Sequence, residues 1–185
     1  MKTVTILIPA YNEEEVLPEF IQTLKEVTEA LTDYQFEFLF INDGSTDGTT
    51  GLLEDYRMTD RRIKFVELSR NFGKEVAMLA GFDFASGDAV IIMDADLQHP
   101  PAMIKEFIDW WEQGYEDVFT VRKERTEESS LKRWGSKMYH ALIQWLSPYQ
   151  IPQGAGDFRL LDRKCVEAIK HMRENARNTK GMYGY

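Results

Sequence analysis

The N-terminal half of the chain alternates short apolar runs with stretches whose apolar side chains recur at helical spacing. The short runs predict strands at Thr3–Ile8, Glu37–Ile41, Lys64–Leu68 and Ala89–Met93. Between the first two runs, the helical repeat consists of Val16, Leu17, Phe20, Ile21, Leu24, Val27 and Leu31. We expect further helices after Ser45, Asn71 and Pro100. This alternation is typical of βαβ units, so we predict an α/β fold with a mostly parallel sheet flanked by helices.

The first helix has a candidate capping box at its start. Asn12 stands three residues before Glu15, and at this spacing each side chain can bond the other residue's backbone amide. Carboxylates at positions 13–15 also suit the positive end of a helix. We therefore expect Asn12 to cap this helix.

The second half of the chain has a different pattern. Asp117–Val121 predicts a strand, and a charged stretch follows it. An amphipathic helix is predicted from the apolar positions Leu131, Trp134, Met138, Tyr139, Leu142, Trp145 and Leu146. The segment GAGDFRLLD, at 154–162, predicts a glycine-rich loop that leads into a strand, and a last helix is expected from about Arg163 to Glu174.

Composition and charge limit the classes of function. The formal net charge of −9 argues against nucleic acid as a partner, because binding to a phosphate backbone requires a basic face. The same charge means that a diphosphate ligand would need a divalent cation or a local basic cluster. No apolar run approaches the roughly 20 residues that span a bilayer. The single cysteine, Cys165, excludes an internal disulfide and a cysteine-rich metal site, and we expect it to be half-buried in a helix.

The N-terminus and several common motifs exclude further classes. The N-terminal segment MKTVTILIPAYNEEE lacks the long apolar core and small-residue cleavage site of a signal peptide, so we expect a cytoplasmic domain. The sequence has neither the P-loop pattern nor a dinucleotide-binding glycine motif after the first strand. Its three histidines lack the context of a nucleophile motif.

Each predicted strand of the first half ends in a polar loop that opens a helix. These loops are PAYNEE, NDGSTDG, SRNFGKE and DADLQHPP. Ligands of open α/β sheets bind at the carboxyl ends of the strands. We therefore expect the four loops to form one binding site.

Asp94 and Asp96 follow the apolar run AVIIM and are the strongest metal candidates. Two carboxylates one residue apart on an extended chain point to the same side and can approach one hard cation. Gln98 can add an amide oxygen, so we expect Asp94, Asp96 and Gln98 to bind Mg²⁺ or Mn²⁺. Two alternatives stay open: the carboxylates are solvated, or Asp96 caps the helix after Pro100.

Candidate nucleoside ligands lie in the first two loops. Asp43 can accept hydrogen bonds from a nucleobase or a ribose, although NDGS is also typical of tight turns. Tyr11 can stack on a base and Glu13 can orient it. The alternatives are a half-exposed aromatic residue and a carboxylate at a helix start.

Two candidates for acceptor binding lie in the second half. The basic cluster, which we define as Arg122, Lys123, Arg125, Lys132, Arg133 and Lys137, can bind phosphate or can be a solvated helix face. Neighbouring aromatic residues suit a segment on an anionic membrane surface, and core packing explains them equally well. Asp157 follows two glycines and can face an acceptor or fix the start of a strand.

Five motifs in this order, PAYNEE, NDGSTDG, SRNFGKE, MDADLQHPP and GAGDFRLLD, resemble glycosyltransferase family 2 over essentially the whole chain. The likeness is greatest to polyisoprenyl-phosphate glycosyltransferases of the bactoprenol glucosyltransferase and dolichol-phosphate mannose synthase type. It implies one GT-A domain over residues 1–185, a nucleotide-sugar half at 1–100 and an acceptor half at 101–185. It also implies inversion at the anomeric carbon. Many members continue into two C-terminal transmembrane helices, so we expect this chain to be part of a longer protein at the cytoplasmic side of a membrane.

The resemblance also implies roles for individual residues. The nucleotide-sugar ligands would be Pro9, Tyr11, Glu13, Asp43 and Asp94, and the metal ligands Asp94, Asp96 and Gln98. Phosphate would meet Arg122, Arg125 and Arg133. Asp157 would be a base or an acceptor-positioning carboxylate, catalytic together with Asp96.

The expected reaction moves a hexose from a nucleotide sugar, with UDP-glucose as first choice, to a polyisoprenyl phosphate. A phosphate monoester has a second pKa of about 6 and is largely ionised at neutral pH, so Asp157 would position the acceptor more than remove a proton. A saccharide hydroxyl acceptor would need a true base. A non-catalytic nucleotide-sugar-binding module is the third option, and a homo-oligomer is compatible with the sequence.

Overall fold

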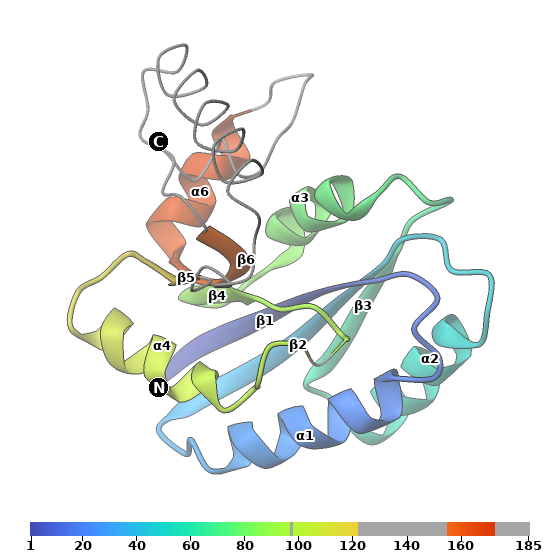
Figure 1. The fold of residues 1–185 in the computed structure, drawn as a ribbon, viewed down its shortest axis with the longest axis horizontal. Coiled ribbons are helices and arrows are strands. Elements are labelled where there is room, and N and C mark those ends of the chain that lie inside the picture. The colour runs from blue at the N-terminus through green and yellow to red at the C-terminus, as the bar shows by residue number, and fades with distance from the viewer. Residues whose placement is uncertain (97, 122–154, 173–185) are drawn as a thin grey trace, which may run out of the picture.

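The computed structural model describes residues 1–96, 98–121 and 155–172, which form one six-stranded sheet with helices on both faces (Figure 1). The strands are β1 (Lys2–Ala10), β2 (Tyr34–Asn42), β3 (Ile63–Glu67), β4 (Ala89–Ile92), β5 (Asp117–Val121) and β6 (Ala155–Asp162). The helices are α1 (Leu17–Glu29), α2 (Thr49–Thr59), α3 (Lys74–Phe84), α4 (Met103–Glu112) and α6 (Arg163–His171). The elements predicted in these segments are thus confirmed, although the last helix ends at His171 instead of near Glu174.

The strand order in the sheet is β3-β2-β1-β4-β6-β5. Strands β1, β2, β3 and β4 pair in parallel, whereas β6 is antiparallel to both of its neighbours, β4 and β5. The late strand β6 therefore separates two strands that precede it in the sequence. This arrangement confirms a mostly parallel α/β sheet, and it brings the start of β6 to the edge at which the parallel strands end.

The sheet buries both of its faces, and alternate residues of each central strand enter different cores. On one face, α1 and α4 pack on β-strand residues that include Val4, Ile6 and Ile8. On the other face, α3 and α6 cover residues that include Leu7 and Val90. This two-sided burial explains why the strands were visible in the sequence as short continuous apolar runs.

The predicted capping box at Asn12 is wrong. Helix α1 begins at Leu17, and its N-cap residue Val16 makes no side-chain capping bond. Asn12 has a φ of 56°, and its side-chain oxygen instead accepts a hydrogen bond from the backbone N–H of Thr46 at 2.8 Å. A contact between two loops has therefore replaced the local contact that the spacing predicted.

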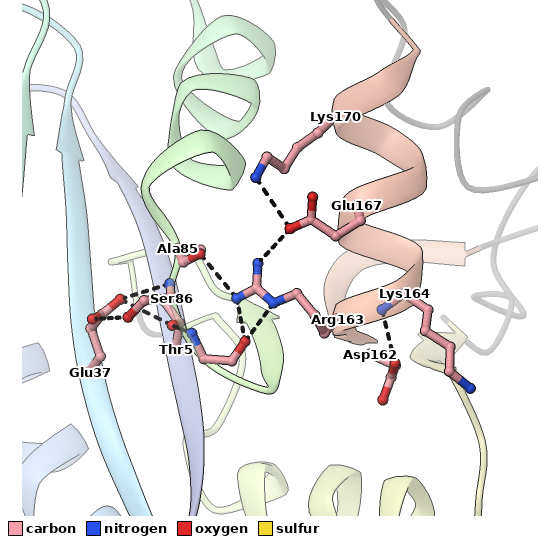
Figure 2. Close-up of polar contacts among 10 residues, drawn as sticks. Thr5, Glu37, Ala85, Ser86, Asp162, Arg163, Lys164, Glu167 and Lys170 are labelled. Atoms are coloured by element: carbon pink, nitrogen blue, oxygen red, sulfur yellow. Dashed lines mark hydrogen bonds and ion pairs between the residues drawn. The ribbon is translucent and has the colours of Figure 1, made fainter.

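On the face of the sheet that α3 and α6 cover, a polar network links β1 and β2 to the C-terminal end of α3 and the start of α6 (Figure 2). Glu37 is only 5% exposed and accepts hydrogen bonds from the hydroxyls of Thr5 and Ser86. Burial raises the pKa of Glu37, but the hydrogen bonds from Lys64 and Ser86 together lower it by more. The pKa of Glu37 is therefore lower than its usual value. Close by, Arg163 at the start of α6 donates to the carbonyl oxygens of Ala85 and Gly87, just after α3 ends. The network thereby fixes the end of α3 against β6 and α6.

Two smaller expectations were also tested. Cys165 lies half-buried in α6, as predicted. Among the described residues, none of the helices combines the length and apolar character that a membrane crossing requires. The predicted helix from Leu131 and the basic cluster lie outside the described residues.

Candidate functional site

A cavity of about 340 Å³ opens at the carboxyl ends of β1, β2 and β4, beside the start of α3. It is lined by Pro9, Ala10, Tyr11, Glu13, Asp43, Asn71, Gly73, Lys74, Ala77, Asp94, Ala95 and Asp96. Six residues that the sequence singled out are therefore brought together: Pro9, Tyr11, Glu13, Asp43, Asp94 and Asp96. Residues from all four of the predicted strand-end loops line this one cavity, whereas their role in ligand binding stays a prediction.

The wall at the end of β1 is fixed by the loop after β2. Besides the bond from Thr46 to Asn12, the backbone N–H of Asn12 donates to the Ser45 hydroxyl at 3.0 Å, and that of Glu13 donates to the Thr49 hydroxyl at 2.9 Å. Tyr11 stays 42% exposed and lies on the rim. An exposed ring on a fixed backbone is suited to stacking on a planar ligand such as a nucleobase.

Asp43 is almost fully buried and orders the neighbouring loop. Its exposed fraction is 3%, and its two oxygens accept hydrogen bonds from the backbone N–H groups of Phe72 and Gly73, both at 2.8 Å. Gly44 adopts a φ of +66°, and a Cβ placed there would lie 2.4 Å from the backbone carbon of Arg70. The β2 loop and the SRNFGKE loop are therefore packed backbone to backbone. A carboxylate can accept more than two hydrogen bonds, so Asp43 can still accept one from a ligand. That contact stays a prediction.

Carboxylates gather on the side of the cavity formed after β4. Asp94 is partly exposed and Asp96 is exposed. Burial raises the pKa of Glu13, and the charges of Asp96 and Asp94 raise it further. Glu13, Asp94 and Asp96 therefore lie close enough for their negative charges to repel one another.

The structure places the three predicted metal ligands, Asp94, Asp96 and Gln98, differently with respect to the cavity. Asp96 does not cap α4, whose N-cap residue is Ala102; its side chain accepts from the backbone N–H of Gln98 at 3.0 Å. The Gln98 side chain is exposed, and Gln98 is not among the described residues that line the cavity. Only Asp94 and Asp96 of the three predicted ligands therefore lie at the cavity. Among the described residues, no group of three or more histidine, cysteine or acidic side chains is arranged around one point as a metal site.

Lys74 is the residue that the sequence reasoning missed. It begins α3, and its ammonium group lies 2.6 Å from Oδ1 and 2.7 Å from Oδ2 of Asp94. The same nitrogen lies 3.4 Å from Oδ2 of Asp157 on β6. Burial lowers the pKa of Lys74, but the ion pairs with Asp94 and Asp157 raise it more, so the lysine is firmly protonated. The feature that could have identified Lys74 in the sequence is a basic residue within the polar SRNFGKE loop of an acidic chain.

Asp157 contacts the residues of the cavity through its ion pair with Lys74. Its side chain is 24% exposed and belongs to β6, which is 83 residues from Lys74 in the sequence. The structure thereby places this predicted acceptor residue beside the predicted donor residues. Three further predicted residues, Arg122, Arg125 and Arg133, lie outside the described residues.

The residues present fit a divalent cation. Mg²⁺ usually takes only one or two protein carboxylates and completes its shell with phosphate oxygens and water. Asp94 and Asp96 supply this number, and Lys74 shows that a positive charge is already held within 3 Å of both Asp94 oxygens. Two aspartate ligands suit a cation that binds together with a phosphate ligand. They suit less well a cation that is bound by the protein alone.

Comparisons with known proteins identify the family of this chain. The model of glycosyl transferase family 2 matches residues 5–170. An uncharacterized glycosyltransferase of Synechocystis sp. is 45% identical over 181 residues, which are 98% of this chain and 57% of the relative. The bactoprenol glucosyl transferase of Shigella phage SfV is 38% identical over 98% of this chain and 59% of its own length. The chain thus spans less than two thirds of these relatives.

Solved structures share the fold at low sequence identity. A mannosyltransferase from Pyrobaculum calidifontis, in complex with GDP-Man and Mn²⁺, has a TM-score of 0.62 and 21% identity over 89% of this chain and 45% of its own. Glucosyl-3-phosphoglycerate synthase from Mycobacterium tuberculosis, in complex with Mn²⁺, UDP-Glc and phosphoglyceric acid, has a TM-score of 0.59 and 20% identity over 90% of this chain and 59% of its own. The predicted GT-A fold is therefore confirmed. With the family model covering most of its length and relatives near 40% identity, the chain belongs to glycosyltransferase family 2.

Proposed function

We propose that this chain is the catalytic part of an inverting, metal-dependent glycosyltransferase that moves a hexose from a nucleotide sugar to a polyisoprenyl phosphate. UDP-glucose is the first candidate donor. The observation that supports the proposal most is that Asp94, Asp96 and Lys74 line one cavity, with Asp157 of β6 3.4 Å from the Lys74 ammonium group. The relatives named bactoprenol glucosyl transferase support the lipid acceptor.

The donor is expected to bind along the cavity from the β1 loop to β4. Tyr11 stacks on the base, Pro9 and Glu13 shape its pocket, and Asp43 holds the loop that faces it and accepts from the nucleoside. Asp94 and Asp96 would hold the Mg²⁺ or Mn²⁺ ion that the reaction requires. Such an ion stabilises the negative charge of the leaving nucleoside diphosphate.

The acceptor is expected to approach from the side of β6. A polyisoprenyl phosphate is already largely ionised at neutral pH, because the second pKa of a phosphate monoester is about 6. Asp157 has no proton to remove from such a nucleophile, so its task is to position the acceptor and to hold Lys74. Arg122, Arg125 and Arg133 would bind the acceptor phosphate and so offset its repulsion from Asp157.

A transfer assay tests the proposal directly. The purified chain is incubated with Mn²⁺, undecaprenyl phosphate in detergent and a panel of radiolabelled UDP- and GDP-sugars, and the lipid phase is counted. We expect label in the lipid phase with one donor, and loss of that label with EDTA or with Asp94→Asn. Transfer to soluble saccharides instead of the lipid would show that the acceptor is a saccharide hydroxyl and not a polyisoprenyl phosphate. Binding of a nucleotide sugar without any turnover, in the full-length protein as well, would leave only a binding module.

The place of action follows from the acceptor. A polyisoprenyl phosphate resides in a membrane, so the domain is proposed to work at the cytoplasmic membrane surface, with the aromatic residues beside the basic cluster at that surface. Co-sedimentation with vesicles that contain anionic phosphatidylglycerol, compared with vesicles of neutral lipid alone, tests the electrostatic share of this contact. Equal sedimentation with both vesicles would contradict it.

A further inference from the structure

Lys74 occupies a position that the proposed reaction does not explain. Both oxygens of Asp94 lie within 2.7 Å of its ammonium group. Asp94 is also the first of the two proposed cation ligands. A divalent cation and an ammonium group therefore compete for the same carboxylate, and two cations that close together repel each other strongly.

The backbone of Lys74 is held in place, so the competition involves only its side chain. Asp43 binds the amides of Phe72 and Gly73, the two residues immediately before Lys74. Arg163 binds the carbonyl oxygens just beyond the other end of α3. When a cation takes Asp94, Lys74 can therefore respond only by swinging its four-carbon stem.

The displaced ammonium group needs a new anionic partner. Its side chain is 39% exposed, and repulsion from a divalent cation close by favours a position in which an anion lies between the two positive charges. Asp157 lies at 3.4 Å but offers a single contact. A nucleoside diphosphate at the cavity brings oxygens within reach of Lys74, and lysine is a common ligand of phosphate.

We propose that Lys74 is a donor-binding residue that couples the cation to the nucleotide: it pairs with Asp94 until a cation arrives and then binds the donor diphosphate. The inference rests on the proposed function. Its consequence is that the cation binds weakly alone and tightly together with the nucleotide. By reciprocity, the nucleotide also binds more tightly with the cation, by the same factor.

A Mn²⁺ titration followed by electron paramagnetic resonance tests the coupling without any turnover, because only unbound Mn²⁺ gives the sharp signal. The titration is performed without nucleotide, with UDP and with GDP. For the unmodified protein we expect the better nucleotide to tighten Mn²⁺ binding at least about fivefold, the lower end of usual coupling factors. For Lys74→Met we expect Mn²⁺ alone to bind at least about fivefold more tightly and the nucleotide effect to fall below about twofold. Lys74→Arg keeps the charge and should keep the coupling.

Lys105→Met is the matched control. Lys105 also pairs with an aspartate at 2.6 Å, but on the exposed face of α4, and its removal should leave Mn²⁺ binding unchanged. Circular dichroism verifies that each variant is folded, and Lys74→Gln replaces Lys74→Met if the latter is not.

The outcomes separate the two proposals. If Lys74→Met binds Mn²⁺ no more tightly than the unmodified protein and keeps the full nucleotide effect, the role of Lys74 is wrong and the proposed function stands. If the unmodified protein binds Mn²⁺ with neither nucleotide, the metal-dependent function itself is wrong.

Discussion

Replacement of Asp43 by asparagine removes one charge and almost no volume, and it tests whether the SRNFGKE loop depends on a buried carboxylate. The two Asp43 oxygens each accept a backbone N–H at 2.8 Å, from Phe72 and Gly73. Asparagine can present an oxygen to only one of these donors, and its NH₂ group then faces the other. Gly73 retains a second acceptor, the side-chain oxygen of Asn71 at 3.0 Å.

The magnitude follows from these contacts. A hydrogen bond to a charged group contributes about 1.5–3 kcal/mol, and a buried donor left without an acceptor costs about 1–3 kcal/mol. Because Gly73 keeps one acceptor, only part of the cost of a buried donor without an acceptor applies. We therefore expect Asp43→Asn to lower the free energy of unfolding by about 2–3 kcal/mol. We also expect the amides of Phe72 and Gly73 to exchange faster with solvent than those of the neighbouring strands.

Urea unfolding followed by circular dichroism measures the first effect, and hydrogen exchange followed by NMR measures the second. Asp83→Asn is the control, since Asp83 is exposed on α3 and its loss removes the same charge from the chain. A change below about 0.5 kcal/mol in Asp43→Asn, the usual range for surface substitutions, together with unchanged exchange of both amides, would refute the reasoning.

Three further predictions concern titrating groups. The hydrogen bonds and charge of Arg62 lower the pKa of Asp60 from 3.8 to about 2, so Asp60 contributes about 2 kcal/mol of stability above pH 4 that is lost as the pH falls toward 2; Asp60→Asn should abolish this part of the acid dependence in urea titrations, and an unchanged slope contradicts it. Burial and the charges of Asp96 and Asp94 raise the pKa of Glu13, so its ionisation opposes folding as the pH rises through that pKa. Glu13→Gln should therefore melt at a higher temperature than the unmodified protein at pH 7, with the difference vanishing below pH 4.5; a lower melting temperature at pH 7 sinks this prediction. Burial raises the pKa of Cys165 from 9.0 to about 11, so iodoacetamide should alkylate it about 100-fold more slowly at neutral pH than in the unfolded chain, as mass spectrometry can measure, whereas equal rates in both states would disprove it.

The sequence was sufficient where a residue's environment depends on its near neighbours. The strands that are buried on both faces stand out as apolar runs, and Asp94 and Asp96 could be located because they directly follow one of them. The convergence of the first four strand-end loops followed from parallel pairing alone. These features predicted the fold and most of the cavity wall.

Long-range pairing decided what the sequence could not show. Asn12 failed as a cap because Thr46, 34 residues away, provides a better donor for its side chain. The role of Lys74 depends on contacts with Asp94 and Asp157, which are 20 and 83 residues away. Nothing in the local pattern indicates which of several lysines meets those carboxylates, so only the folded chain identifies it.

The position of β6 between β4 and β5 has a consequence for how the protein is made. Until β6 emerges from the ribosome, β4 has hydrogen-bonding groups exposed along one side, and β5 has no partner in the described sheet. Residues 1–96 supply every residue that lines the cavity, but Asp157 arrives only with β6. Exposed strand sides attract foreign chains, so a synthesis halted before residue 155 would yield a species that is prone to aggregate and that lacks the Asp157 partner of Lys74.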